Sequence, residues 1–114
     1  MTIPVEFDEL AKTLESFDHA YLLTVSGEGI IKVNAVDPVV TADAVVVEAA
    51  GMQARLNVAG NPVVTLVWPP TVRHGHTLIV DGTAVVEGGN IVIHQTSGLL
   101  HRPGAHSDGP DWEG

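Results

Sequence analysis

The sequence contains no cysteine, which excludes disulfides, thiolate metal sites and cysteine nucleophiles. Basic residues are also scarce: five Lys and Arg stand against 14 Asp and Glu, and the net charge is −9. This balance argues against a general nucleic-acid or anionic-membrane surface. No apolar run reaches about 18 residues, and the acidic start Met1–Phe17 lacks the features of a signal peptide. We therefore expect a cytoplasmic protein that binds neither nucleic acid nor membrane.

β-branched residues dominate what is present. Val occurs 18 times and hydrophobic residues make up 45% of the chain, whereas aromatic residues make up 4%. This composition favours a sheet whose strands are buried on at least one face. A chain of 114 residues is one domain, and a domain this small buries only part of its apolar surface. We therefore expect a mainly β protein that forms a homodimer.

Two stretches have helical spacing of apolar residues, Glu6–Phe17 and Gly51–Ala59. Gly82 lies in the middle of an otherwise regular strand pattern, which predicts a bulge or a close backbone approach there. Six strands on short connections, together with two short helices, predict a small antiparallel barrel. The strands are expected over His19–Val25, Ile30–Val36, Ala44–Glu48, Val63–Trp68, Leu78–Glu87 and Ile91–Thr96.

The last 18 residues have little periodicity. We divide the chain into a barrel domain, residues 1–96, and an extended arm or tail, residues 97–114. Two readings of this segment stay open. It crosses a partner subunit and brings Arg102 into a groove, or it is a flexible end that carries a chance basic residue.

Side chains for direct catalysis are not apparent. No serine stands in the Gly-x-Ser-x-Gly turn of a hydrolase. His74 and His76 are two residues apart, but no spacing ties them to the third ligand that a zinc or iron site needs. We therefore expect neither a catalytic side chain nor a metal site.

The scarce cations are more informative. Lys32 lies within an apolar strand and is followed at i+2, on the same face, by Asn34, while Arg55 lies in the second expected helix. A strand Lys beside the free N–H groups of a helix start is able to bind a phosphate. The alternative is a Lys whose charged end simply extends into solvent from an open sheet face.

The order of elements resembles the pyridoxamine 5′-phosphate oxidase-like family, whose members are flavin-binding split β-barrels. The resemblance is carried by GMQARLNVAGNPVVTLVWPP, where a turn opens a helix that ends in Asn-Pro before a strand, and by TLIVDGTAVVEGG, a strand that contains a glycine. VTLVWPP and LHRPG are similar to short actinobacterial-type members, some of which use a deazaflavin coenzyme. The resemblance covers about two thirds of the chain.

The resemblance implies a six-stranded antiparallel split β-barrel homodimer with cofactor sites at the subunit interface. FMN, or alternatively a deazaflavin coenzyme, would be bound. Lys32 and Arg55 would hold its phosphate, with Gln53 in the same turn. Asn34 and Thr77 would touch the ring or the ribityl chain, and His76 would orient a small-molecule substrate.

Several positions depart from the family pattern. Asp37 stands where a second basic residue is usual, and Glu48 where a Thr or Ser is common. Met52, Gln53 and Ala54 stand where Ser or Thr, Arg and Lys are usual. These changes remove charge-assisted contacts to a phosphate, each worth roughly 1.5–3 kcal/mol.

Two functions follow from the resemblance. The first is an oxidoreductase in which the bound cofactor transfers hydride, other than a true pyridoxamine phosphate oxidase, because the C-terminal extension of that enzyme is not found in the sequence. The second is a non-catalytic module of the same fold that has lost its phosphate ligands and serves storage or sensing, or binds haem or another planar ligand.

Overall fold

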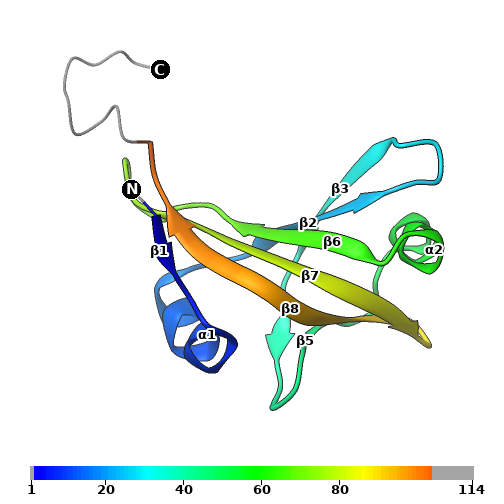
Figure 1. The fold of residues 1–114 in the computed structure, drawn as a ribbon, viewed down its shortest axis with the longest axis horizontal. Coiled ribbons are helices and arrows are strands. Elements are labelled where there is room, and N and C mark those ends of the chain that lie inside the picture. Colours follow the sequence, from blue (N-terminus) through cyan, green and yellow to red (C-terminus); the bar gives the residue numbers. More distant parts are fainter. Residues whose placement is uncertain (1, 104–114) are drawn as a thin grey trace.

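A computed structural model describes residues 2–103. It consists of one curled sheet with two helices packed against it (Figure 1). The helices are α1 (Phe7–Thr13) and α2 (Met52–Gly60), and a single 3-10 turn, η1 (Leu14–Ser16), follows α1. The strands are β1 (Thr2–Pro4), β2 (Ala20–Val25), β3 (Ile31–Val36), β4 (Val39–Val40), β5 (Val45–Val47), β6 (Val63–Trp68), β7 (Thr77–Glu87) and β8 (Asn90–His101).

The sheet is antiparallel, with strand order β3-β2-β6-β7-β8-β5-β4, and β1 pairs with the end of β8. The mainly β class and the two helices are confirmed, whereas the described residues form eight strands rather than six. Two short strands account for the difference. Thr2–Pro4 adds to β8, and Val39–Val40 resumes pairing after Asp37-Pro38 interrupts the chain. No helix in this part of the chain is long and apolar enough to cross a membrane.

The core lies between the inner face of the sheet and the two helices. Alternate residues of β2, β6 and β7 are fully or almost fully buried, as period-two side-chain alternation requires. Leu10 contributes the buried side of α1, and Ala54 and Val58 contribute that of α2. Glu6 and Glu9 form a capping box at the start of α1, which explains why the helix begins where it does.

Strand β8 is longer than the sequence pattern predicts. The expected end at Thr96 is wrong, because residues 97–101 continue the strand and pair with β7. Leu99, Leu100 and His101 also pair with β1. A domain boundary at residue 96 would therefore fall inside a strand. Most of the expected arm, residues 104–114, lies outside the described residues.

Gly82 produces the bulge predicted from the sequence. The pairing between β7 and β8 shifts register between Asp81 and Gly82. A side chain at position 82 would meet the carbonyl oxygen of His94 at 2.6 Å and Cγ2 of Ile93 at 2.7 Å. The absence of Cβ therefore allows the two strands to approach each other closely where the sheet bends.

This close approach predicts that Gly82→Ala destabilises the fold by about 1–3 kcal/mol, the usual range for overpacking a core. The free energy of unfolding in urea measures the effect. Gly89→Ala is the matched control at the end of the same hairpin, because nothing lies within 4 Å of its added Cβ. We expect the control to be neutral or slightly stabilising. Equal losses in both variants would contradict the role assigned to Gly82.

Candidate functional site

The N-terminus of α2 and the inner face of β3 form the first part of the candidate site. Lys32 and Asn34 pair with Thr24 and Leu22 of β2, so all four side chains lie on the inner face of the sheet. A Cβ added to Gly51, the N-cap of α2, would lie 4.0 Å from Nδ2 of Asn34. Lys32 lies two residues from Asn34 on the same face of β3, the strand that contacts α2.

A buried polar chain fixes α2 against β2. Nδ2 of Asn57 donates to Oγ1 of Thr24 at 3.0 Å, and Nε2 of Gln53 donates to Oδ1 of Asn57 at 3.0 Å. Thr24 and Asn57 are buried, and Gln53 is exposed at the surface. Because a buried amide is costly without partners, these bonds hold one orientation of α2, and thereby the position of its first turn.

The first turn of α2 has donors without a side-chain cap. Gly51 makes no capping hydrogen bond, and the first N–H groups of a helix have no partner within the helix. Nε of Arg55 donates to the carbonyl oxygen of Ala50 at 3.0 Å, which holds the guanidinium beside the segment leading into α2. Glu48 is exposed two residues before Ala50 and adds negative charge to this region.

Asn34 carries an unsatisfied acceptor. Its Oδ1 is buried and has no hydrogen-bond partner. Such a group costs about 1–3 kcal/mol unless a ligand or water completes it. The sequence analysis predicted Asn34 as a site residue because it lies on the same strand face as Lys32. The structure adds that its oxygen needs a donor.

His76 and Thr77 lie elsewhere in the same chain. Asn34 of β3 lies in the same cross-strand row as Val80 of β7, with one residue of β2 and one of β6 between them. Three interstrand spacings, or roughly 14 Å, therefore separate Asn34 from Val80. Thr77 lies three residues further along β7, beside the end of β8 rather than α2 (Figure 1). The six predicted cofactor residues therefore form two groups. Lys32, Asn34, Gln53 and Arg55 gather at α2. His76 and Thr77 lie at the opposite end of the sheet, where Thr77 shares the outer face with Asp81 by strand alternation.

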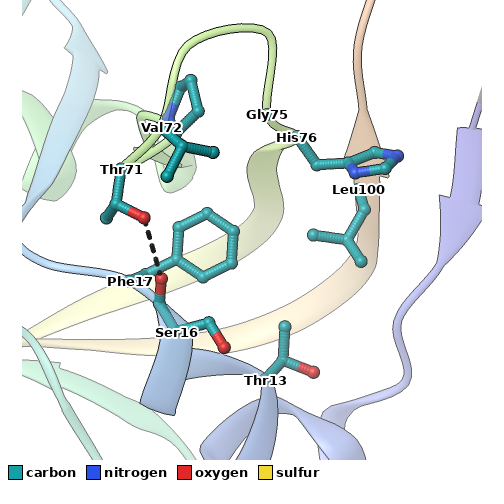
Figure 2. A pocket seen from close by; sticks show the side chains of 9 residues that line it. Thr13, Ser16, Phe17, Thr71, Val72, Gly75, His76 and Leu100 are labelled. Atoms are coloured by element: carbon teal, nitrogen blue, oxygen red, sulfur yellow. Dashed lines mark hydrogen bonds between the residues drawn. The ribbon is translucent and has the colours of Figure 1, made fainter.

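A cavity of about 360 Å³ lies at that opposite end, beside His76. Figure 2 shows Phe17 in its middle, with Thr71 and Val72 on one side and His76 and Leu100 on the other. Sequence reasoning missed this cavity because Phe17 and Leu100 are 83 positions apart and neither stands in a motif. It missed the Thr24–Asn57 pair for a similar reason, although Asn57 follows Gln53 at the i+4 spacing of a helix. Among residues 2–103 no three His, Asp or Glu side chains gather in a way that could hold a metal ion.

Comparison with curated proteins finds two mycobacterial relatives, both described only as uncharacterized. They come from Mycobacterium bovis and Mycobacterium tuberculosis, and each is 38% identical over 89 residues. The match covers 70% of this chain and 63% of each relative, so the chain spans less than two thirds of their length. No family model matches the sequence.

Solved structures show the fold more clearly. An F420 reductase superposes with a TM-score of 0.62 and 17% identity, covering 84% of this chain and 98% of its own. The FAD-binding protein from Mycobacterium smegmatis gives 0.62 and 16%, covering 90% and 100%. HutZ, the haem storage protein from Vibrio cholerae, gives 0.61 and 15%, covering 83% and 93%. These likenesses show that the chain has the split β-barrel fold of the pyridoxamine-phosphate-oxidase-like proteins.

Proposed function

We propose that the protein binds a flavin-type cofactor, FMN or a deazaflavin coenzyme, at the first turn of α2, and that it acts as an oxidoreductase on a small-molecule substrate. When bound, the cofactor supplies hydride transfer. The chain supplies binding and orientation, in agreement with the lack of a nucleophile motif in the sequence. Two structural neighbours, an F420 reductase and an FAD-binding protein, support a cofactor of this type.

The unsatisfied oxygen of Asn34 is the observation that carries the proposal. Oδ1 is an acceptor, so it requires a donor from the ligand. A phosphate dianion has no donor to offer, whereas the ribityl chain of a flavin or deazaflavin carries several hydroxyl groups. Asn34 therefore fits the polar chain of the cofactor better than its phosphate, and it lies beside the N-cap of α2.

The phosphate would lie next to Asn34, between Lys32 and the uncapped start of α2. Backbone N–H groups at a helix N-terminus favour an anion, and an ammonium group strengthens the attraction. Arg55 would contribute from beside Ala50, and Gln53 would act as a neutral donor from the exposed side of the same turn. Lys32 is exposed, so its charged end is accessible to a ligand.

Homodimer formation is part of the proposal, because the outer face of the sheet is strongly apolar. Ile31, Val33 and Val63 lie on that face and are 61%, 54% and 59% exposed. Its central carboxylate, Asp81, already accepts hydrogen bonds from Thr65 at 2.6 Å and from Ser97 at 3.2 Å. A second copy could therefore cover this face without leaving that charge unpaired. A partner subunit would also offer a route for His76 and Thr77 to reach a cofactor bound at α2.

The alternative is a non-catalytic module of the same fold that binds haem or another planar molecule. The first turn of α2 supports it, because Met52, Gln53 and Ala54 bring no cation to a phosphate. HutZ is a haem storage protein of this fold. The pigment released from the purified protein separates the two functions, since a flavin or deazaflavin fluoresces in solution, whereas haem gives a Soret band and does not fluoresce.

We expect Lys32→Ala to weaken binding of FMN or the deazaflavin coenzyme by about tenfold to a hundredfold, the loss of one charge-assisted hydrogen bond. Cofactor fluorescence during titration of the apo protein gives the Kd, and inorganic phosphate should compete. Lys12→Ala is the matched control, because Lys12 is an exposed lysine on α1. Equal affinity of the wild type, Lys32→Ala and Lys12→Ala would show that Lys32 does not contact the cofactor. If neither cofactor binds the wild-type protein, the proposal is wrong.

For the dimer, Val33→Asp places a charge in the apolar outer face and should shift the protein to monomer in sedimentation experiments. Ala11→Glu, on the exposed side of α1, should leave the dimer unchanged. The wild-type protein sedimenting as a monomer at micromolar concentration would contradict this part of the proposal. So would a dimer that tolerates Val33→Asp.

A further inference from the structure

The segment that leads into α2 contains a residue in an unusual backbone conformation. Ala49 has a φ of 50°, in the left-handed region that residues other than glycine rarely adopt. It comes two residues before Gly51, the N-cap of α2. Strained backbone of this kind persists only where the surrounding structure holds it, and it is frequent at functional sites. Ala49 therefore requires contacts from the rest of the fold.

The turn between β7 and β8 supplies these contacts. The backbone N–H of Ala49 donates to Oδ1 of Asn90 at 3.1 Å. The backbone N–H of Ala50 donates to the carbonyl oxygen of Gly89 at 2.8 Å. Two consecutive donors are thus bound by two consecutive residues of the turn. Because Asn90 lies 41 positions further along the chain, tertiary structure rather than local sequence sets the conformation of Ala49.

Ala50 carries this constraint into the first turn of α2. Its carbonyl oxygen accepts a hydrogen bond from Nε of Arg55 at 3.0 Å. The carbonyl oxygen of the next residue, Gly51, accepts one from the backbone N–H of Arg55 at 3.1 Å. A change in the conformation of Ala49 would therefore displace both the uncapped first turn and the guanidinium of Arg55. These are two of the groups that we assign to the cofactor phosphate.

The first turn of α2 depends on backbone geometry because its own side chains bring no positive charge to a phosphate. Met52, Gln53 and Ala54 are uncharged, and Gly51 makes no side-chain cap. Attraction for an anion then rests on backbone N–H groups, whose hydrogen bonds weaken steeply when they are misaligned. A small displacement of the segment before α2 would therefore cost more affinity here than in a turn that contains Arg or Lys.

We propose that Asn90 is a positioning residue for the cofactor phosphate. Its side-chain oxygen holds Ala49 in the left-handed conformation, and thereby sets the direction in which the first N–H groups of α2 and the guanidinium of Arg55 meet the ligand. Asn90 acts through this segment and does not touch the cofactor. The role rests on the cofactor site proposed at α2, and it adds to that site a residue from the turn between β7 and β8.

Two asparagine variants test this role, because the chain offers a matched pair at the two ends of α2. Oδ1 of Asn61 accepts a hydrogen bond from the backbone N–H of Val63 at 3.1 Å, the same distance as in the bond between Asn90 and Ala49. We expect Asn90→Ala to weaken binding of FMN or the deazaflavin coenzyme about fivefold to tenfold, measured by cofactor fluorescence. Asn61→Ala should bind like the wild type, although its melting temperature falls by a comparable amount.

A second substitution separates positioning from a general loss of stability. Glycine adopts a positive φ without the cost that alanine carries, so Ala49→Gly combined with Asn90→Ala should recover most of the lost affinity. Amide spectra of the ¹⁵N-labelled apo protein add a readout that needs no ligand. Asn90→Ala should shift the amide signals of the first turn of α2, whereas Asn61→Ala should leave them in place.

The outcomes separate this role from the cofactor site itself. Equal cofactor affinity of the wild type and Asn90→Ala would overturn the role of Asn90 and leave the cofactor site intact. Equal weakening by Asn61→Ala, no recovery in the double variant, or unchanged amide signals in α2 would overturn the role as well. If the wild-type protein binds neither cofactor, the cofactor site and the role of Asn90 are both wrong.

Discussion

The close contact between β7 and β8 at Gly82 shapes the surface on which the candidate site lies. At this position the backbone of one strand approaches the other to a distance that no side chain allows. The register shift between Asp81 and Gly82 increases the local twist, as bulges do. The sheet therefore curls, and its inner face can hold α1 at one end and α2 at the other (Figure 1). The candidate cofactor site and the His76 cavity lie at these two ends.

The position of α2 depends on a second constraint, the bond between Asn57 and Thr24. Thr24 is a buried hydroxyl on an otherwise apolar strand face, and Asn57 is the buried polar group of α2 that it satisfies. Because this pair has little freedom to shift, the uncapped first turn of α2 stays beside Asn34 and Lys32. Polar groups in the core thus orient the surface that we assign to a cofactor.

Much of the fold could be predicted from the sequence, because strand alternation and turn residues are local signals. The Gly82 bulge and both helices are examples. The end of β8 could not, because residues 97–101 continue the strand through pairing with β7. Leu99–His101 also pair with Thr2–Pro4, almost a hundred positions away. The same limit applies to the site. Lys32 and Asn34 share a face through period-two alternation, but separating His76 and Thr77 from them requires the strand order, which no local pattern contains.

Mapping amide chemical shifts while FMN or the deazaflavin coenzyme is added tests the central claim most directly, because it reports where the cofactor binds. The account predicts that the largest shifts occur at the backbone amides of Met52, Gln53 and Ala54 and at the side-chain amide of Asn34. Inorganic phosphate alone should move the helix amides but not Asn34. Shifts confined to other parts of the protein, or none at saturating cofactor, would contradict the assignment of α2 as the cofactor site.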